Sequence, residues 1–92
     1  MYKEITMTKK NIEKRLINVI DKVFDPKNSI KKSDHYKNDY GMDSFDQLDY
    51  AIAVEEEFDI HFSDSEIIEL SRGTVKDTLD FLYEFMKPFK DE

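Results

Sequence analysis

The chain of 92 residues contains no cysteine and no tryptophan, and only two glycines and two prolines. Without cysteine there is no disulfide framework, no thiolate zinc site and no cysteine nucleophile. No apolar run is long enough to span a membrane, and residues 1–10 lack the apolar core of a signal peptide. We therefore expect a cytoplasmic protein. At this length we expect one domain over residues 1–92, with frayed ends at 1–8 and 88–92, too small for a deep enzyme cleft plus a cofactor fold.

Negative charge dominates the chain, which has 14 basic and 21 acidic residues and a formal net charge of −7. Residues 1–37 contain ten basic and five acidic residues, a balance of +5, whereas residues 38–92 contain four basic and sixteen acidic ones, a balance of −12. An acidic total argues against nucleic acid as the main partner. The uneven distribution means that an account of function must explain the acidic second part.

The first helix is predicted over residues 9–24, where apolar residues are spaced as one helical face. Thr8 is a suitable N-cap, and Pro26 closes the segment. Residues 26–42 then form a long polar connection. A loop of this length in a small domain is usually functional or partly helical. We expect its large apolar side chains to cover one side of the core: Ile30, Tyr36 and Tyr40.

Three further helices are predicted from capping signals. Ser44 and Gln47 fit a capping box, so the second helix is expected to begin at Ser44, or one residue earlier at Asp43, and to end at Phe58. The same signal opens a short helix at Ser63 and a last helix at Thr74. The fold class is therefore an all-α bundle of three main helices plus one short helix, with a long loop between the first and second helices.

The expected core draws on the second half of the chain. Its members are predicted to be Phe45, Leu48, Ile52, Val54, Phe58, Phe62, Ile67, Ile68, Leu70, Val75, Leu79 and Leu82. Phe81, Phe85 and Phe89 form an aromatic stripe on the last helix, which Pro88 is expected to stop. We expect this stripe to widen the core, and an exposed stripe for a partner is the alternative.

The stretch from Asp39 to Asp46 places a serine where a glycine-containing loop meets the start of a helix. The hydroxyl of Ser44 would be exposed there, beside unpaired backbone N–H groups and the positive end of the helix dipole. These groups would favour a phosphate ester on Ser44, although Asp43 and Asp46 would oppose it. The alternative is that Ser44 is simply an N-cap, worth about 1 kcal/mol.

Residues 39–46 resemble the phosphopantetheine attachment motif of acyl carrier proteins, whose common form is Asp-Leu-Gly-Ala-Asp-Ser-Leu-Asp. Residues 54–60 resemble the end of the family's second helix, and Ile30 and Tyr36 stand where the family has apolar loop residues. Similarity continues at the starts of the third and fourth helices, in Phe62, Ser63, Asp64, Glu66, Thr74, Val75, Leu79, Phe81 and Leu82. The resemblance covers residues 12–82 and implies an acyl-carrier-type bundle.

By this resemblance, Ser44 carries a 4′-phosphopantetheine arm, which a phosphopantetheinyl transferase adds from coenzyme A. The arm's thiol would hold an acyl group as a thioester, and the protein would present it to partner enzymes of fatty-acid or related acyl biosynthesis and shelter it between its helices. We expect a monomer without catalysis of its own. The alternatives are a specialised carrier for polyketide, nonribosomal peptide or other dedicated acyl transfer, and an unmodified carrier-fold protein that binds partners through its acidic helix. No base and nucleophile are placed together as an enzyme would need.

Several residues near the expected arm depart from the family pattern. Tyr40 and Phe45 replace leucine, Met42 replaces alanine, and Tyr36 replaces phenylalanine. Because these substitutions change bulk or polarity, they predict a change in which acyl groups fit inside the bundle and in how partners dock.

The acidic residues of the second helix allow two interpretations. Asp46, Asp49, Glu56 and Glu57 fall within roughly a third of the helix circumference, and a solvated surface is the simpler explanation. The resemblance instead implies a docking face for basic patches on partner enzymes, with electrostatic steering that weakens as salt rises. The residues of this face would be Asp43, Phe45, Asp46, Asp49, Glu55 and Glu56.

No metal site is expected. His35 and His61 lack neighbours at ligand spacing, and the acidic residues 39–49 lack the Asp-x-Asp-x-Asp-Gly pattern of a calcium loop.

Overall fold

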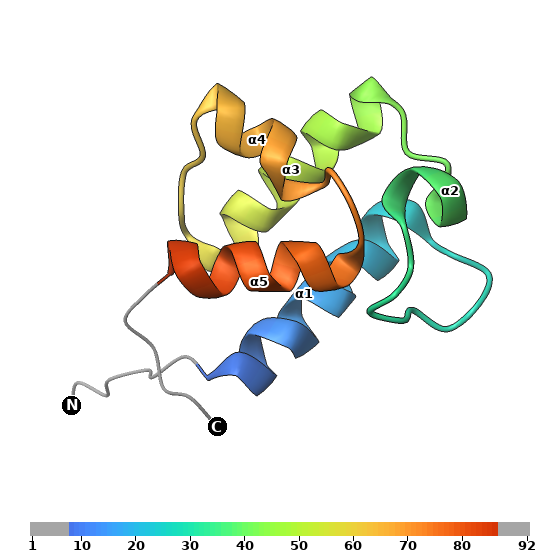
Figure 1. Ribbon diagram of the computed structural model, residues 1–92, viewed down its shortest axis with the longest axis horizontal. Coiled ribbons are helices and arrows are strands. Elements are labelled where there is room, and N and C mark those ends of the chain that lie inside the picture. Colours follow the sequence, from blue (N-terminus) through green and yellow to red (C-terminus); the bar gives the residue numbers. More distant parts are fainter. Residues whose placement is uncertain (1–7, 87–92) are drawn as a thin grey trace.

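The computed structural model describes residues 8–86. This part of the chain forms five helices and no strand: α1 (Lys9–Phe24), α2 (Tyr36–Tyr40), α3 (Ser44–Phe58), α4 (Asp64–Leu70) and α5 (Val75–Phe85). In Figure 1, α1 and α5 lie across the lower part of the molecule, α4 lies above α5, and α2 lies at one end. None of the helices in residues 8–86 has the length and apolar character needed to cross a bilayer.

The predicted helix starts are confirmed where a hydroxyl caps the helix. Thr8 accepts a hydrogen bond from the N–H of Asn11 at the start of α1. Ser63 and Thr74 form capping boxes at the starts of α4 and α5. The predicted bounds of the first helix are also confirmed, and Asp25 ends it with a left-handed φ of 46°. Pro88 and Phe89, expected to stop the last helix and to extend its aromatic stripe, lie outside the described residues.

The all-α bundle is confirmed, and the long connection between the first two main helices is partly helical. It contains α2, whose five residues are too few for periodicity to predict. The side chain of His35 caps this helix by accepting from the N–H of Asn38. The loop is joined to the start of α5, because the N–H of Val75 donates to the carbonyl of Asp34 at 3.0 Å and His35 forms a bridge with Thr74.

The core prediction is wrong for one side of α3. Phe45, Leu48 and Ile52 were expected to be buried, but 80%, 50% and 44% of their surfaces are exposed, and Ile68 of α4 is 53% exposed. The buried residues of α3 are instead Tyr50, Ala51, Val54 and Phe58. Both sets have helical spacing, so α3 carries two apolar stripes. The second one faces the core because α3 packs chiefly against α1 on that side.

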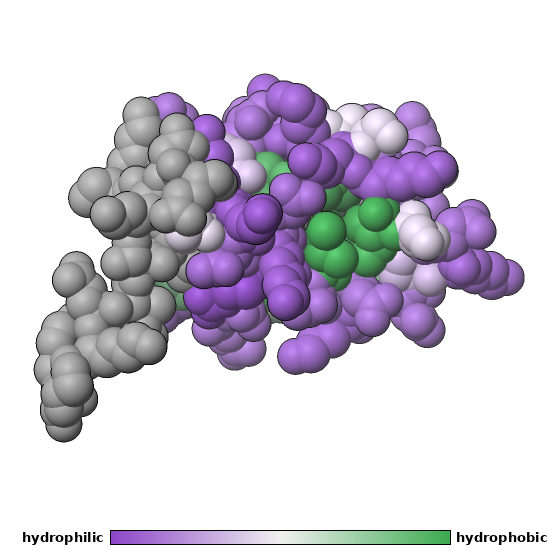
Figure 2. Space-filling model, turned by 90° about the horizontal axis from the view of Figure 1, so that it is seen from below, coloured by the Kyte–Doolittle hydropathy of each residue, from purple (hydrophilic) through white to green (hydrophobic). Residues whose placement is uncertain are grey.

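The other expected core residues are buried or half-buried. Val54, Phe58, Phe62, Leu70, Val75, Leu79 and Leu82 are buried, and Ile67 packs against them. α1 adds Ile12, Leu16, Val19 and Ile20, and α2 adds Tyr36. The aromatic stripe widens the core, since the rings of Phe81 and Phe85 lie 5.9 and 5.0 Å from that of Phe62. The surface differs from this apolar core. The face seen in Figure 2 is mostly hydrophilic, and its hydrophobic side chains occupy a small area.

Candidate functional site

Three residues, Gly41 to Asp43, connect α2 to α3 and so position Ser44 at the first residue of α3. Gly41 ends α2 with a φ of +67°, a conformation that glycine adopts without the steric cost of a Cβ. Its N–H donates to the carbonyl of Lys37, and the N–H of Met42 donates to that of Tyr36 at 3.1 Å. These two hydrogen bonds attach the connection to α2 and so fix where α3 begins.

Asp43, rather than Ser44, caps α3. The Oδ1 atom of Asp43 accepts from the N–H of Asp46 at 2.8 Å, and Oδ2 of Asp46 accepts from the N–H of Asp43 at 3.2 Å. The expected capping box of Ser44 and Gln47 is therefore wrong by one residue. A carboxylate is a good N-cap acceptor, and here two of them satisfy each other's backbone donors.

The hydroxyl of Ser44 is consequently available. Ser44 is exposed, and within residues 8–86 its side chain has no hydrogen-bond partner. The interpretation of Ser44 as a simple N-cap is therefore wrong. The N–H groups of Ser44 and Phe45 are in the first turn, where a helix offers no acceptor for them. Three residues earlier the chain is also open, because a Cβ built on Gly41 would meet no atom within 4 Å.

Beyond Ser44, the exposed face of α3 carries both apolar and acidic side chains. Phe45, Leu48 and Ile52 follow one another at helical spacing, and Asp49 and Glu56 lie four residues after Phe45 and Ile52. Five side chains at this spacing share one face of a helix. We call these five residues the α3 outer face. It places acids and exposed apolar groups together, where the sequence predicted them on opposite sides.

Two acids of α3 have structural partners. Oε2 of Glu55 accepts from the N–H of Phe62 at 2.7 Å, which fixes the connection between α3 and α4. Glu57 forms an ion pair with Arg15 of α1, with 2.7 Å between Nε and Oε2. Of the predicted docking residues, Asp49, Glu56 and Phe45 are exposed without such a contact among the described residues, while Asp43 and Asp46 form the capping box.

Behind α3, three fully buried hydroxyls form a hydrogen-bonded chain across four helices. The hydroxyl of Tyr36 (α2) donates to Oγ1 of Thr78 (α5) at 2.7 Å, and Thr78 in turn donates to the carbonyl of Leu70 (α4). Since Tyr36 has one proton, Tyr50 (α3) must be the donor in their contact of 2.7 Å. We call Tyr50, Tyr36 and Thr78 the hydroxyl chain. Burial raises the pKa of Tyr36 to about 12 and that of Tyr50 well above its ordinary value. The hydroxyl chain is therefore uncharged at physiological pH. Sequence reasoning missed it, because Tyr50 stood outside the expected core.

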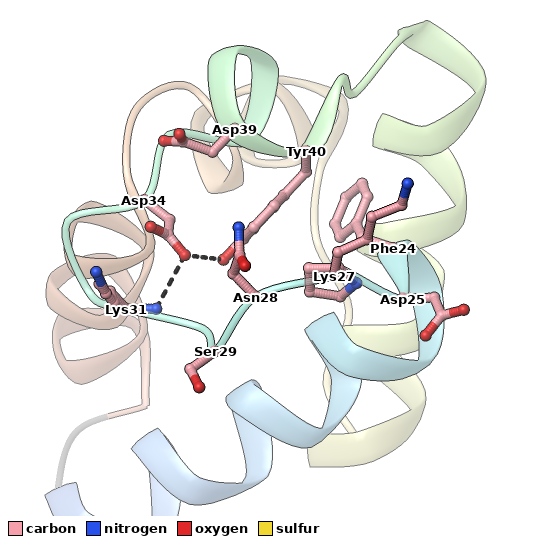
Figure 3. Close-up of a pocket in the computed structure, with 10 residues that line it drawn as sticks. Phe24, Asp25, Lys27, Asn28, Ser29, Lys31, Asp34, Asp39 and Tyr40 are labelled. Atoms are coloured by element: carbon pink, nitrogen blue, oxygen red, sulfur yellow. Dashed lines mark hydrogen bonds between the residues drawn. The ribbon is translucent and has the colours of Figure 1, made fainter.

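A surface pocket of about 720 Å³ lies beside α2, between the end of α1 and the following loop (Figure 3). In it, Oδ2 of Asp34 accepts from the hydroxyl of Tyr40 at 2.7 Å and from the N–H of Lys31 at 2.9 Å. The hydrogen bond from the Lys31 N–H has the largest effect and lowers the pKa of Asp34. The bond from the Tyr40 hydroxyl lowers it further, whereas burial acts in the opposite direction. Burial and the bond to Asp34 raise the pKa of Tyr40. These contacts fix the loop, and Ser44 is not among the residues that line the pocket.

No group of three histidine, aspartate or glutamate side chains that could hold a metal ion occurs in the described part of the chain. This concerns residues 8–86 alone.

The sequence profile of the phosphopantetheine attachment site matches residues 14–82. This match, the all-helical fold and an exposed serine at the start of a helix define a phosphopantetheine carrier. The chain is 38% identical to the acyl carrier protein of Buchnera aphidicola over 74 residues, which cover 79% of this chain and 90% of that protein.

Two mitochondrial acyl carrier proteins are also similar. The protein of Neurospora crassa is 42% identical over 52 residues, which cover 56% of this chain and 38% of that protein. The protein of Saccharomyces cerevisiae is 36% identical over 83 residues, which cover 83% of this chain and 63% of that protein. The chain thus spans less than two thirds of the length of these two relatives. Together with the profile match, the similarity shows that the chain belongs to the acyl carrier protein family.

Members of this family are carriers rather than enzymes, and 4′-phosphopantetheine is their cofactor. When bound, this group supplies a flexible arm with a terminal thiol, which holds an acyl group as a thioester. The residues present fit such an arm, because the Ser44 hydroxyl is exposed and is not used in capping. The chain has no thiol of its own, since it contains no cysteine.

Proposed function

We propose that Ser44 is the attachment residue of the arm, and that the protein presents acyl groups to enzymes of fatty-acid or related acyl biosynthesis. The observation that carries the proposal is the availability of the Ser44 hydroxyl, which Asp43 releases from capping. Ser44 also lies within the matched residues 14–82. A phosphopantetheinyl transferase would add the arm from coenzyme A.

Loading of the arm tests this assignment directly. We expect intact mass spectrometry to find one added phosphopantetheine after incubation with coenzyme A and a broad-specificity transferase. Ser44→Ala should abolish the addition, and Ser65→Ala is the matched control, because Ser65 is also an exposed serine in the first turn of a helix. No addition to the wild type under conditions that load a control carrier would instead support an unmodified interaction module.

We further propose that partner enzymes dock on the α3 outer face and the adjoining start of α3. The docking residues are those expected from the sequence: Asp43, Phe45, Asp46, Asp49, Glu55 and Glu56. Exposure of Phe45 supports this role, because aromatic side chains are enriched at protein–protein interfaces relative to the rest of the surface. Asp49 and Glu56 offer carboxylates to basic patches on the partner, and such pairs mainly raise the association rate. Glu55 contributes by fixing the connection to α4.

The dependence of transferase kinetics on salt tests the docking face. Added salt should lower kcat/KM for loading, because screening weakens steering between exposed charges. Asp49→Lys and Phe45→Ala should lower kcat/KM further, whereas Asp21→Lys, an exposed acid on α1, should not. Kinetics independent of salt and of Asp49→Lys would leave the acidic residues as a solvated surface.

A monomeric single domain in the cytoplasm is our proposal for the protein in the cell. Two of the similar proteins are named mitochondrial, so a mitochondrial location is the alternative. Light scattering of the purified protein tests the monomer, and cell fractionation tests the location.

A further inference from the structure

The interior between α2, α3 and α5 is occupied by the hydroxyl chain and by the aromatic rings around it. Tyr36, Tyr50 and Thr78 are each fully buried. The ring of Phe24 lies 5.4 Å from that of Tyr50 and 6.1 Å from that of Tyr36, and these two tyrosine rings lie 5.1 Å apart. Side chains from α1, α2, α3 and α5 thus meet in one packed cluster behind the start of α3.

Each proton of the hydroxyl chain has an acceptor. Tyr50 donates to Tyr36, Tyr36 to Thr78, and Thr78 to the carbonyl of Leu70. An apolar chain that entered between α3 and α5 would have to separate these partners without offering hydrogen bonds of its own. Buried hydroxyls that lose their partners are strongly unfavourable, and a packed core does not yield space without displacing whole side chains.

Three pockets of the described residues lie around the bundle, apart from the hydroxyl chain. One, of about 720 Å³, lies at the surface beside α2 and is lined by charged and polar groups such as Lys27, Lys31 and Asp39. A second, of about 270 Å³ between α1 and α3, has Lys22 and Glu56 among its lining residues. A third, of about 390 Å³ between α4 and α5, is lined by Phe81 together with charged side chains such as Glu69 and Arg72. No member of the hydroxyl chain lines any of the three.

We infer that the hydroxyl chain keeps the acyl group outside the helix bundle, so that this carrier holds short acyl groups and does not shelter long ones. The inference rests on the proposed function, because it presupposes an arm on Ser44. Tyr36 and Tyr50 act here as specificity-determining residues. A short acyl group exposes little apolar surface when it stays on the arm, whereas a long one left in water is disfavoured in proportion to its area.

The test compares butanoyl, octanoyl and dodecanoyl groups loaded on the wild-type protein from the corresponding acyl-coenzyme A. The first readout is the rate at which hydroxylamine cleaves the thioester, which falls when the acyl group is held inside. The second is the set of backbone amide signals of Tyr50, Leu70 and Leu79 in nuclear magnetic resonance spectra. We expect cleavage rates within about threefold of each other, since a threefold fall corresponds to a buried to exposed ratio of about two to one, and unmoved core signals. A larger fall with chain length, or shifted core signals, overturns the inference.

Substitution of the hydroxyl chain provides the converse test. Tyr50→Leu removes the terminal hydroxyl and much of the ring, so the rate for dodecanoyl should fall more than about threefold below that for butanoyl, as expected for a mostly buried population. Tyr83→Leu is the matched control, because Tyr83 is a half-buried tyrosine of α5 outside the hydroxyl chain, with its ring beside Lys9, and it should behave as the wild type. A folded Tyr50→Leu variant without length dependence contradicts the role of Tyr50, and if this variant does not fold, the wild-type comparison decides. Failure to load any group refutes the proposed attachment site, whereas loading followed by burial refutes the inference alone.

Discussion

Replacing Tyr36 by phenylalanine removes the middle member of the hydroxyl chain while keeping its ring. Tyr36 both accepts from Tyr50 and donates to Thr78, so Tyr36→Phe deletes two hydrogen bonds and leaves the buried hydroxyl of Tyr50 without an acceptor. Tyr50→Phe deletes only the bond at the end of the chain and leaves no donor unpaired. The two substitutions remove the same atom type from the same cluster, but we expect unequal losses of stability.

The magnitudes follow from the number of bonds lost. A hydrogen bond contributes about 1 kcal/mol net, and a buried hydroxyl without a partner costs about 1–3 kcal/mol. We expect Tyr50→Phe to lower the free energy of unfolding by about 1 kcal/mol and Tyr36→Phe by about 2–4 kcal/mol. The double variant loses the same two bonds as Tyr36→Phe but no longer contains the unpaired hydroxyl. It should therefore be no less stable than Tyr36→Phe alone, so that the two effects do not add.

Urea unfolding followed by circular dichroism measures these differences, with linear extrapolation to water and two-state behaviour expected at this length. Tyr40→Phe is the control, because its hydroxyl bonds to Asp34 at a partly exposed position, and it should cost at most about 1 kcal/mol. Equal losses from the two single variants, adding in the double variant, would refute the direction of the hydroxyl chain and the burial of its members.

Four further substitutions test the site and its supports. Asp43→Ala should lower the unfolding free energy by about 1 kcal/mol through loss of the N-cap, whereas Ser44→Ala should change it by less than about 0.5 kcal/mol. If urea unfolding shows the larger loss for Ser44→Ala, Ser44 is the N-cap instead. Gly41→Ala should lower the unfolding free energy by about 1 kcal/mol in the same assay, because a residue with a Cβ is strained at a φ of +67° even where space is open. An unchanged unfolding free energy would contradict this backbone conformation. The pKa of Asp34 is lower in the fold than its ordinary value of 3.8, so its carboxylate stabilises the fold above that pH. This contribution is lost as the pH falls below the ordinary value and through the lower pKa of the folded state. Between about pH 6 and pH 3, the urea midpoint should therefore fall less in Asp34→Asn than in the wild type, and equal falls would exclude Asp34 as a source of acid sensitivity.

The helix starts and the serine motif could be predicted because they depend on residues close together in the sequence. Capping links Thr8 to Asn11 and Ser63 to Glu66 over three positions, and such contacts form in any chain that becomes helical there. The same locality limits the prediction at Ser44. Asp43 and Ser44 are neighbouring residues that can both cap, and the choice between them changes the serine from a structural residue to an available one.

The sequence by itself therefore determined α1, α3, α4 and α5, the acidic second part and the place of Ser44 after a glycine-containing connection. Tertiary structure decided which of two apolar stripes on α3 is buried, because that depends on the surfaces of α1 and α2 that face it. It also formed the hydroxyl chain, whose contacts join residues 14 and 42 positions apart. Neither result is encoded in local spacing, since both stripes of α3 repeat with the same helical period. Packing exposed Phe45 and buried Tyr50, and this choice gives the carrier both its outer face and its filled interior.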